Sequence, residues 1–344
     1  MDLSGARLGM LRCAAAAALF GATIPTASRL SGETSAPVLA GLLYLGAAIA
    51  VAPLARGQRL ERPAVRRSLG PLLIAVVAGG FLGPLLLAAG LARTPAATAS
   101  LMLNLELVAT TFLAAVFFGE HLGRRVLTGT VFVTAAGALL AWSGSPDLRL
   151  GALLLAAACV CWGLDNCVTA GLDRIAPEHI TLAKGAIAGT TNLVLGFALG
   201  GSLPSGPDTL LALVAGGFGY GLSITLWVAG ARDLGAARGQ LVFSTAPFLG
   251  VLVAWVLLGD AVRGVEVVAL ALAAVGVLRV LGSDHEHAHE HKRFVHDHDH
   301  VHDEHHRHHD ELAVPRHGHE HVHEELVHAH PHVPDLHHRH VHGA

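Results

Sequence analysis

Three ionisable side chains lie in stretches of the chain that are otherwise apolar enough to span a bilayer. They are Glu106, Asp165 and Lys184, and Lys184 is the only lysine before residue 292. A charged group at membrane depth costs roughly 2.5–3.5 kcal/mol on insertion scales, so such groups usually face a bundle interior or a water-filled cavity. The residues expected to line a substrate or proton pathway are therefore Asp165, Lys184, Glu106, Asn166, Asn104 and Trp162.

The three charges allow two interpretations. In the first, Glu106 or Asp165 binds a proton or a cationic substrate, and Lys184 holds an anionic group or tunes the acid. A carboxyl group in a low-dielectric cavity titrates closer to neutral pH, as proton coupling requires. In the second, Lys184 pairs with one carboxylate and fixes two helices together. The two are compatible, because an ion pair that breaks when substrate binds would act as a gate.

Asn104 and Glu106 are two residues apart on one expected helix. Side chains at this spacing point to different faces, so at most one of the two can look squarely into a cavity.

The composition indicates a protein that crosses the membrane many times. Of 344 residues, 52% are hydrophobic and 14% are charged, whereas soluble domains carry about 25% charged residues. About 20 apolar residues are needed to cross a bilayer as a helix. Ten stretches meet this need, near residues 8–27, 36–55, 70–91, 97–118, 126–143, 151–170, 180–200, 209–230, 238–258 and 264–282.

Arginine predicts the orientation of these spans. The loops after even-numbered spans hold most of the arginines, and the loop after the second span contributes Arg56, Arg59, Arg62, Arg66 and Arg67. Because cytoplasmic loops carry an excess of basic residues, we expect these loops and both termini to be cytoplasmic.

Two parts of the chain resemble each other, residues 8–143 and 151–282. When they are aligned, Gly119-Glu120 meets Gly259-Asp260, and Ala96-Ala97 meets Ala236-Ala237. Each part has five spans, and an odd number means that the second part enters from the opposite side. This predicts an inverted repeat, in which a transporter binds substrate near the midplane between its halves.

These motifs resemble the EamA domain of the drug/metabolite transporter superfamily, repeated twice over about residues 10–282. The second copy keeps a helix proline, Pro247, where the first has Leu107 within Asn104-Leu105-Glu106-Leu107. With Trp162-Gly163-Leu164-Asp165-Asn166 and Lys184-Gly185, this variant looks like a bacterial subgroup that ends in a His-rich tail. The resemblance implies an all-α, ten-helix, five-plus-five inverted repeat in the bacterial inner membrane. It leaves the substrate open.

The tail, residues 283–344, differs sharply from the rest. Of the 25 histidines in the chain, only His121 and His179 precede it. We expect it to be cytoplasmic and disordered, since it is too polar to bury a core. Imidazole binds zinc, nickel, cobalt and copper. The candidate metal ligands are His285, His287, His289, His298, His300, His302, His319, His321, His323, His330 and His332.

The function expected from these features is secondary transport of a small metabolite or drug-like solute, coupled to protons, with export as one candidate direction. The alternative is a transition-metal transporter, or a membrane-anchored metal buffer or sensor. We expect no enzyme, because no phosphate loop or nucleophile motif is found. We also expect no required cofactor and no nucleic-acid partner, and we expect one chain with two repeats to act as a monomer.

Overall fold

The membrane part of the protein is helical throughout the residues that the structure describes. The computed structural model describes the backbone of residues 3–60, 62–118, 124–142, 145–170, 172, 175–234, 236–281, 285–291, 294–300, 317–323 and 326–332. The first half contains α1 (Leu3–Ser31), α2 (Ala36–Arg56), α3 (Arg62–Arg67), α4 (Leu69–Ile74), η1 (Ala75–Leu82), α5 (Gly83–Leu91), α6 (Ala96–Met102), α7 (Leu105–Phe118) and α8 (Arg124–Trp142). The second half contains α9 (Pro146–Ala170), α10 (Pro177–Ala183), η2 (Lys184–Ala188), α11 (Gly189–Ala198), α12 (Gly206–Gly216), η3 (Gly217–Leu222), α13 (Ser223–Leu234), α14 (Ala236–Phe243), α15 (Ala246–Val253), η4 (Ala254–Leu258) and α16 (Gly264–Leu281).

These helices match the membrane crossings expected from the sequence. Within the described residues, 9 helical stretches are long and apolar enough to cross a bilayer. The tenth expected crossing coincides with α16, Gly264–Leu281. Apolar side chains such as Val131 and Leu278 are exposed on the outside of the bundle. Such side chains suit contact with lipid tails, which are as apolar as leucine.

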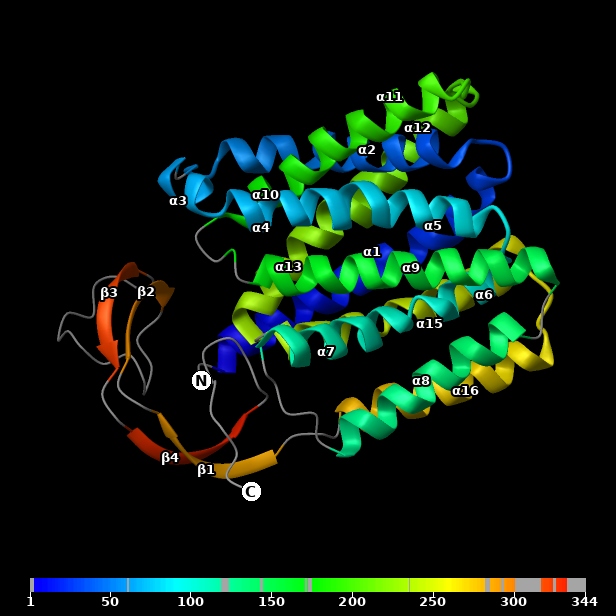
Figure 1. Ribbon diagram of the computed structural model, residues 1–344. Coiled ribbons are helices and arrows are strands. Elements are labelled where there is room, and N and C mark those ends of the chain that lie inside the picture. The colour runs from blue at the N-terminus through cyan, green and yellow to red at the C-terminus, as the bar shows by residue number, and fades with distance from the viewer. Residues whose placement is uncertain are drawn as a thin grey trace.

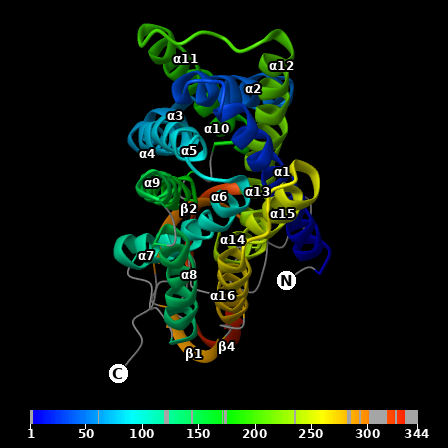
Figure 2. The ribbon, with the colours of Figure 1, turned by 90° about the vertical axis from the view of Figure 1, so that its right-hand side faces the viewer.

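Figures 1 and 2 show that α8 and α16, the last helices of the two halves, pack against each other at one side of the bundle. The remaining helices form the body that holds the buried polar residues. The start of α1 and the arginine-rich α3 lie at the same end of the bundle (Figure 1). This agrees with the expectation that the N-terminus and the loop after the second span lie on one side of the membrane.

Two expected spans, 97–118 and 238–258, are interrupted rather than continuous. The fourth span breaks between α6 and α7 at Leu103 and Asn104, and the ninth breaks between α14 and α15 at Ser244 and Thr245. Pro247 explains the second break, because proline lacks an N–H and disfavours helix before it. At the first break, the Asn104 side chain donates a hydrogen bond to the carbonyl of Leu101 at 3.2 Å. This bond competes with the backbone hydrogen bonds of the helix.

Four short π-helical segments, η1 to η4, also interrupt the spans. A π-turn widens the helix and shifts its backbone hydrogen bonds, and such turns are frequent at functional sites. Gly79 lies in η1, Lys184 begins η2, and Tyr220 lies in η3. The sequence analysis did not anticipate these segments.

The described part of the tail contains four strands, β1 (His285–His291), β2 (Phe294–His300), β3 (His317–His323) and β4 (Leu326–His332). β1 pairs with β4 and β2 with β3, both antiparallel. The strands differ from the disorder expected here, and they follow the histidine pattern, whose period of two is that of an extended chain. An isolated two-stranded sheet is marginally stable in water, so disorder of the whole tail stays a prediction.

Small residues set the spacing of α2 and α12. A Cβ atom added at Gly216 would overlap the backbone of Leu43, and one added at Gly46 would overlap the backbone of Leu213. The two helices therefore touch backbone to backbone, as small residues permit in membranes.

We predict that Gly216→Ala destabilises the protein, because the added methyl group must push α2 and α12 apart. Overpacking of this kind costs about 1–3 kcal/mol. The matched control is Gly70→Ala, since nothing lies within 4 Å of a Cβ added there. Thermal unfolding of both variants in detergent checks this, and equal melting temperatures would contradict it.

Candidate functional site

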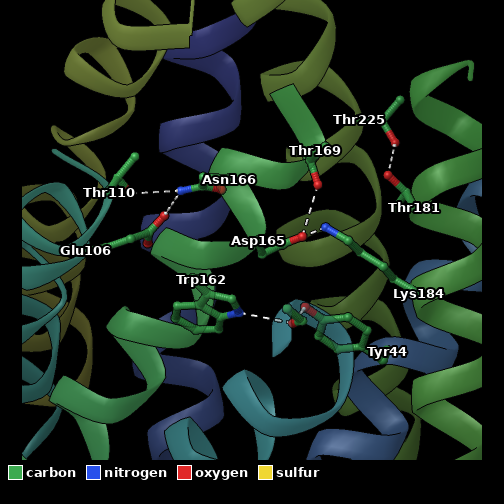
Figure 3. A network of polar contacts seen from close by, with 11 residues as sticks. Tyr44, Glu106, Thr110, Trp162, Asp165, Asn166, Thr169, Thr181, Lys184 and Thr225 are labelled. Carbon is green, nitrogen blue, oxygen red and sulfur yellow. Dashed lines mark hydrogen bonds and ion pairs between the residues drawn. The ribbon is translucent and has the colours of Figure 1, made fainter. Parts of the chain in front are cut away.

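One face of α9 carries most of the polar residues at the centre of the bundle. Trp162, Asp165, Asn166 and Thr169 lie on α9, at spacings of three, four and seven residues that bring side chains to one side of a helix. Asp165 and Asn166 are neighbours, and their side chains point about 100° apart around the helix. Asn166 points toward Glu106 and Asp165 toward Lys184, so they reach two different groups of residues (Figure 3).

The first group is a buried ion pair. Lys184 Nζ lies 2.6 Å from Asp165 Oδ2, and the two side chains are only 2% and 9% exposed. Thr169 Oγ1 donates to Asp165 Oδ1 at 3.0 Å. Removing two charges from water is costly, and close pairing with additional hydrogen bonds offsets that cost. The pair joins α9 to the start of η2.

Gly79 makes room for this pair. A Cβ atom at position 79 would overlap the Asp165 carboxylate. The carbonyl of Gly79 accepts from Tyr44 Oη at 2.7 Å and from Trp162 Nε1 at 3.1 Å. Both bonds are drawn in Figure 3. The π-helical η1 thus presents a backbone acceptor that orients two aromatic rings.

The second group surrounds Glu106. Its Oε1 accepts from Asn166 Nδ2 at 2.8 Å and from Gln240 Nε2 at 3.4 Å. Asn166 Nδ2 also lies 3.3 Å from Thr110 Oγ1. Glu106 is in the first turn of α7, where the positive end of the helix dipole favours a carboxylate.

Glu106 differs from Asp165 in having no ion-pair partner among the described residues. It is only 7% exposed. Among the residues that the structure describes, no Lys, Arg or His comes within ion-pair distance of its carboxylate. Neutral amides alone hold this buried acid.

A cavity lies between the two groups and is bordered by both halves of the chain. The space open to the centres of water molecules is about 50 Å³. Its aromatic wall contains ring pairs at centroid distances of 5.9 Å (Phe20–Trp162), 5.6 Å (Phe20–Tyr220), 5.4 Å (Phe20–Phe243), 5.4 Å (Tyr44–Tyr220) and 6.4 Å (Trp227–Phe243).

Three lining residues carry buried polar atoms without a hydrogen-bond partner in the structure: Tyr220 Oη, Trp227 Nε1 and Gln240 Oε1. Buried polar groups are normally hydrogen-bonded, and each exception asks for an explanation such as a missing water or ligand. Three of the ten such atoms found among the described residues therefore border this one cavity.

The structure brings together most of the residues singled out from the sequence. Asp165, Lys184, Glu106, Asn166 and Trp162 all line the cavity. Asn104 does not, and lies in the break before α7, in keeping with the expectation that only one of Asn104 and Glu106 faces inward.

The sequence analysis missed Gln240 and most of the aromatic wall. One signal was available, because the chain has only 2 tyrosines, and both line the cavity. Of the predicted metal ligands, His302 lies outside the described residues, and the others lie on β1 to β4.

We predict that removing one member of the ion pair is worse than removing both. Asp165→Asn or Lys184→Met alone leaves a buried charge unpaired and should cost about 3–5 kcal/mol, whereas the double variant should recover much of the loss. Unfolding of the purified proteins in detergent checks this. Additive losses in the double variant would show that the two side chains do not interact.

Comparison with known proteins agrees with this architecture. The EamA-like transporter family matches residues 7–142 and 149–282. An uncharacterized transporter of Methanothermobacter thermautotrophicus is 28% identical over 197 residues, which cover 55% of this chain and 57% of that protein. One crystal structure has the same fold, with a TM-score of 0.60 and 24% identity over 82% of this chain and 99% of its own. The chain therefore belongs to the EamA-like transporter family and is a multi-pass membrane protein.

Proposed function

We propose that the protein is a proton-coupled secondary transporter of a small organic solute, which binds in the cavity between the two repeats. The observation that carries this proposal is the cavity itself. It combines an ion pair, a second carboxylate and three unpartnered polar atoms with an aromatic wall. Solute sites with mostly apolar walls and a few placed polar groups follow this pattern. We propose that it acts as a monomer, because both repeats that border the cavity belong to the same chain.

Glu106 is the proposed proton carrier. Amide groups of Asn166 and Gln240 can satisfy the carboxylate, yet no cation locks it in the charged form. Asp165 is held by Lys184, so this pair serves as a gate that fixes α9 to η2 and opens when α9 moves. Buried carboxyl groups shielded from water are suited to proton exchange near neutral pH.

Export is the proposed direction, across a bacterial inner membrane with both termini in the cytoplasm. Lining residues Thr169, Trp227 and Gln240 lie toward the helix ends that the arginine pattern assigns to the cytoplasm. A cavity that lies nearer the cytoplasmic end favours loading from inside the cell.

We predict that Glu106→Gln abolishes proton-driven transport while the protein still folds. Purified protein in liposomes with an imposed pH gradient should move solute, and the variant should fall to the level of protein-free liposomes. Glu33→Gln is the control, because Glu33 is exposed. A Glu106→Gln variant that still responds to the pH gradient would exclude Glu106 as the proton carrier.

The tail supports a second candidate function, that of a membrane-anchored buffer or sensor of transition metals. Strand pairing places His287 opposite His330 and His289 opposite His328, and His298 opposite His319. Residues directly opposite in an antiparallel pair have Cβ atoms about 4.5–5.5 Å apart, and alternate residues share a face. Each strand pair therefore brings histidine positions opposite one another in sequence register, and histidine is a ligand type that suits zinc, nickel, cobalt and copper.

A metal path through the membrane has less support than a metal-binding tail. No His, Cys or Met is among the residues that line the cavity. Among the described side chains, no group of three His, Cys, Asp or Glu is placed to hold a metal ion.

We predict that the strand histidines bind zinc as sets. Replacing His296, His298, His319 and His321 with asparagine should lower the number of zinc ions bound with high affinity, measured by calorimetry on the full chain, while β1 and β4 keep their histidines. The matched control replaces His305, His306, His308 and His309, which lie between the strands in sequence. Equal losses in both variants would mean that histidine content, and not strand pairing, determines binding.

A further inference from the structure

We infer that the transported solute is a small organic monocation with an apolar body, such as a primary or methylated amine. The inference rests on the proposed transport function and adds the chemical class of the solute to it. Three independent features of the cavity support it: its net charge, its aromatic wall, and the types of its unpartnered polar atoms.

The first feature is the net charge of the residues that line the cavity. Two carboxylates, Asp165 and Glu106, meet one ammonium group, Lys184. Lys184 Nζ lies 2.6 Å from Asp165 Oδ2 and neutralises that carboxylate. Glu106 is left with only amide donors. A buried charge without a counter-charge is costly, and a bound cation removes that cost. One uncompensated carboxylate matches a single positive charge.

The aromatic wall has the complementary property. Phe20 is the hub of a continuous series of rings, with Trp162, Tyr220 and Phe243 at centroid distances of 5.9, 5.6 and 5.4 Å. Aromatic faces carry negative charge density and attract cations, most strongly when water is excluded. A wall of this kind also binds the apolar part of an amine, so it selects against strongly hydrated inorganic cations.

The polar atoms that lack a hydrogen-bond partner narrow the chemical class of the solute further. Gln240 Oε1 is an acceptor without a partner, on the same amide whose Nε2 donates to Glu106. It is therefore placed beside the carboxylate to accept an ammonium N–H. Trp227 Nε1 is a donor only, and Tyr220 Oη can donate or accept, so the opposite part of the solute can carry a neutral oxygen such as a hydroxyl.

A carboxylate on the solute fits less well than a hydroxyl. The one cation of the described lining, Lys184, is already engaged by Asp165. A zwitterion would have to break that pair or leave its own carboxylate without a counter-charge. We therefore expect an amine to bind more tightly than the corresponding amino acid.

The test is a charge series at constant shape, measured by calorimetry on the full-length protein in detergent. The probes are 2-phenylethylamine, 2-phenylethanol, 3-phenylpropionate and phenylalanine. We expect the amine to bind at least about tenfold more tightly than the other three, which corresponds to about 1.4 kcal/mol. Equal or tighter binding of the neutral, anionic or zwitterionic probe would overturn the inference.

Two variants test whether Glu106 and the aromatic wall are the groups that bind the amine. Glu106→Gln should weaken the amine at least about tenfold and leave the alcohol unchanged, while the exposed control Glu33→Gln changes neither. Phe243→Leu keeps an apolar side chain but removes a ring, and should weaken the amine about two- to thirtyfold. If Glu106→Gln fails to fold, the charge series on the unaltered protein decides alone. An amine that binds Glu106→Gln as tightly as the unaltered protein refutes the inference.

Transport assays in liposomes distinguish a failure of this inference from a failure of the proposed function. If liposomes containing the protein transport neutral or anionic organic solutes but no amine, the inference fails and the transport function stands. If they transport no organic solute under a pH gradient, the proposed function itself fails.

Discussion

The membrane interior supplies no water to solvate a charge, and this constraint shapes the centre of the protein. Asp165 and Lys184 meet that constraint by pairing with each other at 2.6 Å. The pair fixes α9 against η2 and requires a residue without a side chain at position 79. The freed carbonyl of Gly79 then orients Tyr44 and Trp162. The glycine at position 79 and the orientation of two rings of the aromatic wall are thus linked to one buried interaction.

The two carboxylates that line the cavity have different neighbours, and the proposed chemistry of the site rests on this difference. Asp165 has a cation, whereas Glu106 has only amide donors from α9 and α14. The adjacent positions of Asp165 and Asn166 on α9 let one helix serve both acids. A rotation or shift of α9 would disturb both groups together, so the helix can couple the gate to the site that holds the proton or the solute.

Much of this arrangement is predictable from the sequence. The apolar stretches predict the helices, and the costly charges within them point to Asp165, Lys184 and Glu106 as interior residues. Pairing of Lys184 with a carboxylate is also foreseeable, although not which one. The breaks at Asn104 and Ser244 have local causes, the Asn104 side chain and Pro247, but neither residue type by itself requires a helix to break. The π-turns have no comparable signal in the sequence. Gln240 reaches Glu106 across 134 positions, and which aromatic residues face inward depends on how each helix is rotated by its packing.

The central claim is that Glu106, unlike Asp165, is a buried acid left free for a proton or a solute cation. Hydrophobic carbodiimides form stable adducts with protonated carboxyl groups in apolar surroundings, and mass spectrometry locates the adduct. We predict modification at Glu106, reduced when 2-phenylethylamine is present, with Asp165 protected by Lys184. Modification of Asp165 while Glu106 stays unmodified would contradict the account.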